Sequence, residues 1–168
     1  FSCMPTDYAI SRLAFRILAD PVELDARGQP VRIPYGLRKI ESDLVSRVGR
    51  DHVVIADPRN VQRFITEDTE VIGVHTMDPL GLGPVSMSFT MGGTLTPYTK
   101  AMFLEMMAQV THRPGRKYTV GLGGPGAWHF DYRPEMQQSL GIDTIVHGEC
   151  DHIATDIFEQ VARGDAPP

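Results

Sequence analysis

Apolar residues recur at helical spacing in several parts of the chain. Leu37, Ile40, Leu44 and Val48 form one such stripe, which predicts an amphipathic helix that ends at Gly49. Comparable spacing predicts helices in other segments: near 8–19, after Asp57-Pro58, after Thr96-Pro97, over 134–140 and from Ile153 to Val161.

Short apolar runs, rich in β-branched residues, lie between these helices and predict buried strands. The four runs are Val53–Ala56, Val71–Val74, Tyr118–Leu122 and Thr144–Val146. Because strands and helices alternate along the chain, they predict a parallel sheet with helices on both faces. Wholly apolar strands are typical of such a doubly covered sheet. The expected fold is α/β, a Rossmann-like doubly wound three-layer sandwich with a mostly parallel sheet.

The length of 168 residues fits one domain of the usual ~100–200 residues. Residues 1–34 are predicted to be an irregular N-terminal segment that contains a helix. Residues 35–165 are predicted to form the α/β domain, and residues 166–168 a linker toward a further domain. The chain begins with Phe1, so we interpret it as a fragment.

Composition narrows the classes of partner. The net charge is −5, and the basic residues form no cluster, so we expect no nucleic-acid partner. No apolar run approaches the ~18 residues that a membrane span needs, so we expect no membrane partner. Two cysteines, Cys3 and Cys150, lie too far apart in sequence to suggest a disulfide framework, which favours a reducing, cytoplasmic location.

The loops that follow the predicted strands are candidates for a binding site, because ligands of open parallel sheets bind at the carboxyl ends of the strands. The segment Asp78–Gly93 is long for a compact domain, and its glycines allow close backbone approach to a ligand. One interpretation is a lining for a bulky cofactor or substrate. The alternative is a connection packed on the edge of the domain itself.

Two further loops carry suggestive residues. The glycines of Gly123–Gly126 allow close packing of a nucleotide-like tail or ring, although the segment matches no phosphate-binding fingerprint. Trp128 has two interpretations: it covers a ligand, or it seals the edge of the core. His147–His152 contains possible zinc ligands at no known ligand spacing. A turn in which Asp151 caps the final helix is the favoured interpretation, and no metal site or catalytic side chain is predicted.

Several stretches match one family when they are taken together in order. They are Pro34–Glu41, Val54–Pro58, Met77–Pro84, Gly123–Trp128, and Gly141-Ile142-Asp143 through Gly148-Glu149. In these stretches the chain resembles the N-terminal cobalamin-binding-like domain of uncharacterised radical S-adenosylmethionine (SAM) proteins. The resemblance covers residues 34–168, and Met77–Pro84 and Gly123–Trp128 are its most specific part.

The resemblance implies a Rossmann-like domain that precedes a radical SAM barrel, which is then the expected partner within the same chain. In the family, that barrel holds SAM and a [4Fe–4S] cluster on a C-x-x-x-C-x-x-C motif. This chain lacks the motif, so it is not expected to be catalytic alone. It also lacks the D-x-H-x-x-G signature of a histidine ligand to cobalt. The resemblance implies cobalamin as cofactor, facing these residues: Asp78, Pro79, Leu80, Gly81, Leu82, Gly83, Ser86, Gly123, Gly124, Pro125, Gly126, Trp128, Gly148 and Glu149.

Three functions remain open from the sequence. The leading hypothesis is a cofactor-binding or substrate-gating domain of a radical SAM enzyme, which presents a corrinoid at the strand ends. The second is a degenerate domain that keeps the fold and serves substrate binding or assembly. The third is a freestanding nucleotide- or flavin-binding α/β protein, which is disfavoured because no phosphate fingerprint is present.

Overall fold

A computed structural model describes residues 2–150 and 152–165. In this part of the chain, β1 (Val71–His75), β2 (Thr119–Gly123) and β3 (Thr144–Ile145) form a sheet in the order β1-β2-β3. All three strands are parallel. The fold is therefore α/β, with a parallel sheet flanked by helices in a Rossmann-like, doubly wound arrangement, and the predicted fold class is confirmed.

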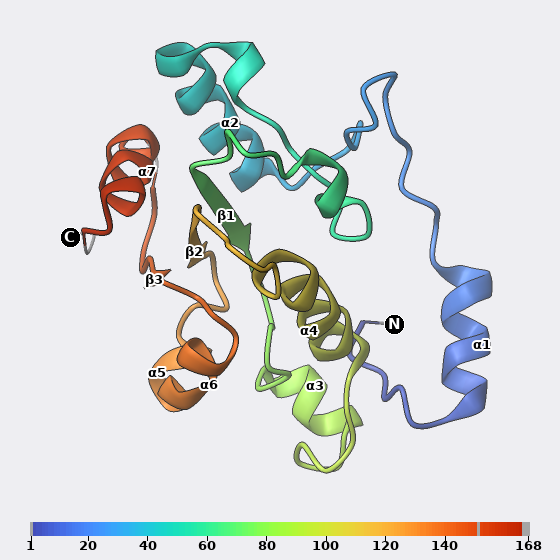
Figure 1. Ribbon diagram of the computed structural model, residues 1–168. Coiled ribbons are helices and arrows are strands. Elements are labelled where there is room, and N and C mark those ends of the chain that lie inside the picture. The colour runs from blue at the N-terminus through green and yellow to red at the C-terminus, as the bar shows by residue number, and fades with distance from the viewer. Residues whose placement is uncertain (1, 151, 166–168) are drawn as a thin grey trace.

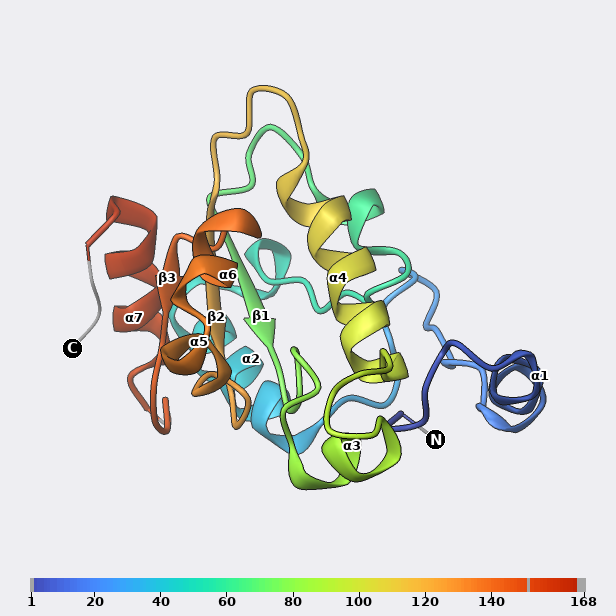
Figure 2. The ribbon, with the colours of Figure 1, turned by 90° about the horizontal axis from the view of Figure 1, so that it is seen from below.

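Three long helices cover the two faces of this sheet. The helix α4 (Tyr98–Thr111) lies on one face, and α2 (Tyr35–Val48) and α7 (Ala154–Arg163) lie on the other (Figure 1). The view from below also places α4 and α7 on opposite sides of the strands (Figure 2). The shorter elements are α3 (Pro84–Phe89), α5 (His129–Tyr132), α6 (Pro134–Ser139), η1 (Arg50–His52) and η2 (Val61–Phe64).

The main hydrophobic core lies between the sheet and α4. Alternate residues of a strand point to the same face, so Val74, Val120 and Leu122 share the face that α4 covers. They belong to one buried cluster with Phe103 and Met107 of α4. The helical stripe predicted after Thr96-Pro97 thus packs as expected, and it anchors β1 and β2.

The opposite face is closed by helices that are tied to each other by polar contacts. The backbone N–H of Thr155 donates a hydrogen bond to the Asp43 carboxylate at 3.0 Å, and its hydroxyl donates to the same oxygen at 3.1 Å. Asp43 on α2 therefore satisfies the first turn of α7, which favours a negative charge. The predicted cap, Asp151, lies outside the described residues.

Three predictions of local structure are wrong. Val53–Ala56 is not a strand, because it pairs with no other strand among the described residues; the Ile55 N–H donates instead to the side chain of Gln29. The glycine- and proline-rich composition of Asp78–Gly93 predicts an irregular segment, but α3 begins within it at Pro84, a residue whose fixed φ favours the first helical turn. The pair Thr96-Pro97 predicts a cap for the helix that follows, but Thr96 does not cap α4 with its side chain.

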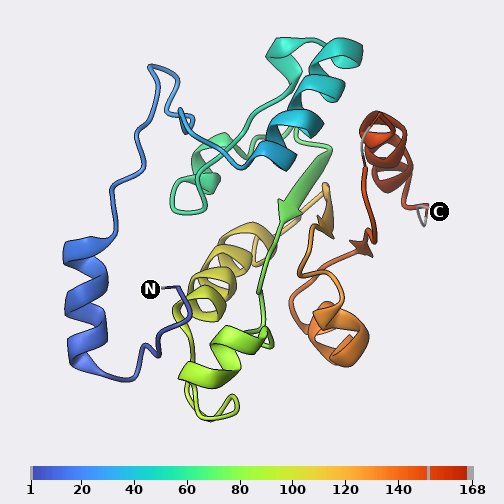
Figure 3. The ribbon, with the colours of Figure 1, turned by 180° about the vertical axis from the view of Figure 1, so that it is seen from behind.

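The N-terminal segment is held on the start of α4. The Thr6 N–H donates to the Thr96 carbonyl at 2.8 Å, and the Tyr98 N–H donates to the Met4 carbonyl at 3.0 Å. The predicted helix near 8–19 is present as α1 (Ala9–Leu18), where Phe15 stacks on Tyr98 with ring centroids 4.3 Å apart. Figure 3 shows α1 standing away from the sheet, beyond α4.

Candidate functional site

The three loops predicted to carry the site leave the same edge of the sheet. The parallel register pairs His75 with Gly123 at the ends of β1 and β2, and Leu122 with Ile145. The Thr76 and Val146 N–H groups then donate to the Gly123 and Leu122 carbonyls, at 2.9 and 2.8 Å. This arrangement gathers the loops at the carboxyl ends of the strands, where sheets of this type bind ligands.

Asp78 organises the first of these loops. Its Oδ1 accepts a hydrogen bond from the Gly83 N–H at 2.9 Å, and its Oδ2 accepts one from the Ser86 hydroxyl. The Thr99 hydroxyl donates to the Asp78 carbonyl at 3.0 Å, which ties the loop to α4. The carboxylate thus caps the start of α3, where a negative charge is favourable. Asp78 therefore has a structural role that its strand-end position does not reveal.

His129 joins the first loop to the second. Its Nδ1 accepts a hydrogen bond from the Leu80 N–H at 3.2 Å, so the ring proton lies on Nε2. That Nε2 lies 3.5 Å from Asp78 Oδ1 and has no hydrogen-bond partner among the described residues. Burial lowers the pKa of His129 below its ordinary value of 6.5, while the nearby Asp78 charge opposes this change.

The group of Asp78, His129 and Ser86 lacks the geometry of a nucleophilic site. The Ser86 side chain is fully buried, so no substrate reaches its hydroxyl, which donates to the Asp78 carboxylate rather than to His129. A serine nucleophile needs a base that takes its proton and a path to substrate. These three side chains instead fix the loop against α3 and α5.

The residues predicted to face cobalamin differ widely in exposure. One group is buried: Pro79, Leu80, Gly81, Ser86 and Gly126. A second group is partly buried: Asp78, Leu82, Gly83, Gly123 and Gly124. A third group is exposed: Pro125, Trp128, Gly148 and Glu149. Their contact with a ligand stays a prediction, and the exposed group offers the most direct access.

The glycines of the second loop allow the first two loops to pack together. Gly124 has φ +95°, and a Cβ there would lie 2.6 Å from the Thr76 carbonyl oxygen. A Cβ on Gly126 would lie 2.7 Å from the Met77 carbonyl oxygen. The Gly126 N–H also donates to the Thr76 carbonyl at 3.1 Å. Contact between the two loops is therefore sufficient to explain these two glycines.

Exposed apolar side chains surround this loop contact. Met77, Trp128 and Tyr132 are 74%, 39% and 74% exposed, and the rings of Trp128 and Tyr132 meet edge to face at 5.5 Å. His147 Nε2, after β3, lies 3.4 Å from the Asp131 Oδ1 of α5, which brings the third loop to the same place. We call this surface the strand-end rim, formed by these residues: Met77, Pro125, Trp128, Tyr132, Gly148 and Glu149.

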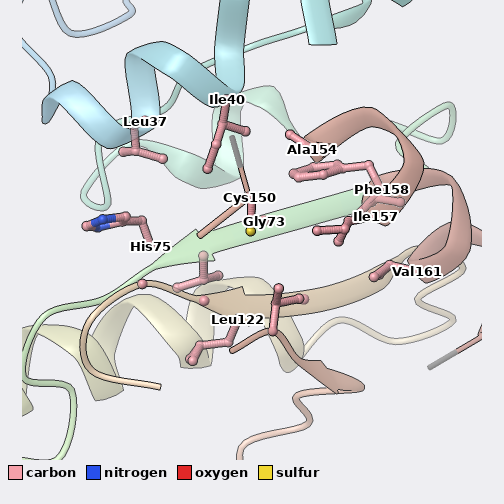
Figure 4. Close-up of a pocket in the computed structure, with 16 residues that line it drawn as sticks. Leu37, Ile40, Gly73, His75, Leu122, Cys150, Ala154, Ile157, Phe158 and Val161 are labelled. Carbon is pink, nitrogen blue, oxygen red and sulfur yellow. The ribbon is translucent and has the colours of Figure 1, made fainter. Parts of the chain in front are cut away.

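A cavity of about 80 Å³ lies on the face of the sheet that α2 and α7 cover (Figure 4). We call it the glycine-face cavity. Its floor is the backbone of β1 and β2, and side chains of both helices line it without closing it, so that Gly73 on the floor stays exposed. Six of its lining residues are Leu37, Ile40, Gly73, Gly121, Ala154 and Phe158. His75 and Cys150 also line it, at the carboxyl end of β1 and before α7.

Glycines make the floor of this cavity bare. Gly73 pairs with Gly121 across the two strands, and Gly123 pairs with His75 on the same face. A Cβ on Gly73 would lie 2.6 Å from Cζ of Phe158, so this glycine is needed for the ring of α7 to reach the sheet. A Cβ on Gly121 would meet Val161 at an ordinary 3.6 Å. This cavity was not predicted from the sequence, although Gly73 in β1 and the alternating Gly121 and Gly123 in β2 were a visible signal.

The described residues give little support for metal chemistry. Within residues 2–150 and 152–165, no group of three or more His, Cys, Asp or Glu side chains could hold a metal ion. In the same part of the chain, no helix is both long and apolar enough to cross a bilayer. Among the described residues of the third loop, none therefore forms such a group with His75, His129 or Cys3, the histidines and the cysteine that could have completed a zinc site.

Fold and site together define a class: an α/β protein with a parallel, Rossmann-like sheet and two candidate binding regions, the strand-end rim and the glycine-face cavity. Comparisons with protein-family models, with curated proteins and with solved structures each find no match.

Proposed function

We propose that the chain is a ligand-binding domain without a catalytic centre of its own, which works beside a radical SAM domain and binds a corrinoid. The link to radical SAM proteins rests on the resemblance in sequence. The observation that carries the proposal is the strand-end rim. Three loops meet there, at the edge where parallel sheets bind ligands, and they expose Met77, Trp128 and Tyr132.

The exposed side chains of the rim support this proposal. The face of a corrin ring is broad and apolar, and an exposed methionine and two aromatic rings offer contact area for such a face. Gly148 adds open space, because a Cβ there would meet nothing within 4 Å. The residues that would hold the corrinoid are Met77, Trp128, Tyr132, Gly148 and Glu149. When bound, the corrinoid would supply a cobalt centre for methyl transfer or radical chemistry.

Two other regions do not fit the macrocycle. The glycine-face cavity, at about 80 Å³, is far too small for it. The polar groups of Asp78 and Ser86 already bond to each other inside the protein. A corrinoid would therefore lie outside on the rim and would leave the Asp78–Ser86 loop in place.

The internal bonding of that loop favours a second candidate function. In this alternative, the domain keeps the fold, binds no corrinoid, and uses the same surface for substrate binding or assembly. Pro79, Leu80 and Gly81 are buried against the protein itself, as expected of a loop that supports the structure rather than a cofactor.

A cobalamin titration separates the two candidates. The chain is mixed with hydroxocobalamin or methylcobalamin, and visible absorbance and co-elution in gel filtration are followed. We expect one equivalent to bind and Tyr132→Ala to weaken binding at least ~10-fold, as for an aromatic residue central to an interface. Tyr8→Ala removes an exposed tyrosine next to α1 and is the matched control. Absence of binding to the unaltered chain would favour the second candidate.

A bulky substitution such as Gly124→Trp, which would block the second loop, does not test where the corrinoid binds. Gly124 has φ +95° and lies against the Thr76 backbone, so a large side chain there would disturb the loops themselves. Loss of binding in that variant would not distinguish a blocked site from a distorted one. Tyr132 is exposed, so its truncation changes the rim without opening the core.

A further inference from the structure

We propose that the glycine-face cavity is a binding site for a small, uncharged, apolar group, such as an aromatic ring or a short alkyl chain. The site is separate from the strand-end rim, and the inference holds whether or not the rim binds a corrinoid. It rests on the lining of the cavity, on its bare floor and on the way its roof is held.

The lining selects for apolar chemistry. Leu37 and Ile40 enter from α2, and Phe158 and Ala154 enter from α7 (Figure 4). His75 and Cys150 are the polar side chains of the lining. Burial lowers the pKa of His75, so the ring favours its neutral form. A charged ligand would lose its hydration here without gaining an ionic partner.

The floor leaves room that a larger residue would fill. Buried parallel strands usually carry large apolar side chains on both faces. Here Gly73 and Gly121 stand side by side, and only Gly73 is explained by the ring of Phe158. A methyl group on Gly121 would make ordinary contacts at 3.6 Å and would extend into the cavity. The absence of a side chain at this position therefore maintains space beyond what packing of α7 requires.

The two helices that form the roof are joined to each other as well as to the floor, which Phe158 meets at Gly73. Asp43 of α2 accepts hydrogen bonds from Thr155 of α7, and Arg47 lies 3.4 Å from Asp156. These contacts join the two helices to each other across the cavity. They allow the helices to remain in place while an apolar group occupies the space between them and the sheet.

The size of the cavity limits the ligand. A volume of about 80 Å³ is about half of the ~150 Å³ cavity that takes up benzene in another protein, so only a small apolar group fits, with part of it at the open side of the pocket. Benzene and xenon are the small molecules known to enter apolar protein cavities. These two molecules are therefore suitable probes for the site.

The test measures benzene and xenon binding to the whole chain. We expect benzene to raise the melting temperature by roughly 2–4 °C, through preferential binding to the folded state. We expect xenon to shift the NMR signals of residues around Gly73 and Ala154 in a saturable way. Ala154→Leu fills the cavity from α7, and Gly121→Ala fills it from β2. In each variant, the affinity for benzene and for xenon should be at least ~10-fold lower than in the unaltered chain.

Ala108→Leu is the matched control, because it makes the same exchange at an exposed position of α4. It should bind both probes as the unaltered chain does. Gly121→Ala keeps the test decisive if Ala154→Leu does not fold. Absence of saturable binding to the unaltered chain, or equal binding by Gly121→Ala, would overturn the proposal. Cobalamin binding at the rim should be unchanged in Gly121→Ala, so the two proposals can fail separately.

Discussion

The two faces of the sheet share the same strands but differ in what covers the backbone. On the face under α4, Val74, Val120 and Leu122 form a continuous apolar layer against Phe103 and Met107. On the face under α2 and α7, Gly73, Gly121 and Gly123 leave the backbone bare. Side chains alternate along a strand, so a shift of one residue in register would exchange the two surfaces.

This difference assigns the two faces different tasks. Dense packing between the strands and α4 supplies most of the cohesion, because large apolar groups lose their contact with water there. The other face carries a half-open pocket of about 80 Å³ between the strands and the two helices. The packing under α4 therefore holds the strands in place beside this less filled face.

Truncation of a core residue should show the largest effect. Leu122→Ala removes a fully buried side chain from the α4 face, and we expect it to lower the free energy of unfolding by about 3–4 kcal/mol. Ile157→Ala truncates a buried side chain beside the existing cavity, so it has fewer contacts to lose, and we expect about 2 kcal/mol. Urea denaturation measures both values. Equal losses would contradict the proposed asymmetry of the two faces.

Addition of a single methyl group should distinguish the two paired glycines. Gly73→Ala would place its Cβ 2.6 Å from the Phe158 ring, and we expect a loss of about 1–3 kcal/mol in the free energy of unfolding. Gly121→Ala meets only ordinary contacts, so a change under ~1 kcal/mol is expected.

A double-mutant cycle then tests the cause of the loss at Gly73. Phe158→Leu shortens the side chain that blocks the methyl group, so Gly73→Ala should cost less than half as much in that background. Denaturant titrations of the four proteins measure the coupling. Independent effects of the two substitutions would show that Phe158 is not what requires a glycine at position 73.

The asymmetry also explains what the sequence could predict. Periodic apolar stripes correctly predicted α2, α4 and α7, and β-branched runs predicted β1 and β2, since these elements bury one regular surface. Val53–Ala56 is also rich in β-branched residues, yet it forms no strand. A strand requires a partner, and partners depend on tertiary structure rather than on local preference.

The candidate site was predictable at the level of loops but not of side chains. Alternation of strands and helices correctly placed the loops after β1, β2 and β3 at one edge. It could not show that Asp78 caps α3, or that Gly124 and Gly126 serve contact between loops. In the same pattern, Gly73 and Gly121 are ordinary positions of apolar strands. The pattern therefore did not predict the cavity above them.

The smallest expected effect concerns pH and the buried imidazole of His129, which lies at the strand ends between the α4 face and the rim. Its pKa is lowered in the folded protein, so below about pH 6.5 the unfolded chain binds more protons than the folded one. Stability should therefore be complete above this pH and fall as the pH decreases toward the folded pKa. We expect about 1 kcal/mol or less to be lost between pH 7 and 5.5 through this residue.

His129→Gln tests this source of the pH dependence. A glutamine oxygen can still accept the Leu80 N–H, but the side chain does not titrate in this range. The free energy of unfolding, measured by urea denaturation at several pH values, should fall less steeply in this variant. His112→Gln changes an exposed histidine on the C-terminal side of α4 and should leave the slope unaltered. An equal slope in His129→Gln and the unaltered chain would mean that His129 carries no such linkage, and that its burial is matched by interaction of its protonated form with Asp78.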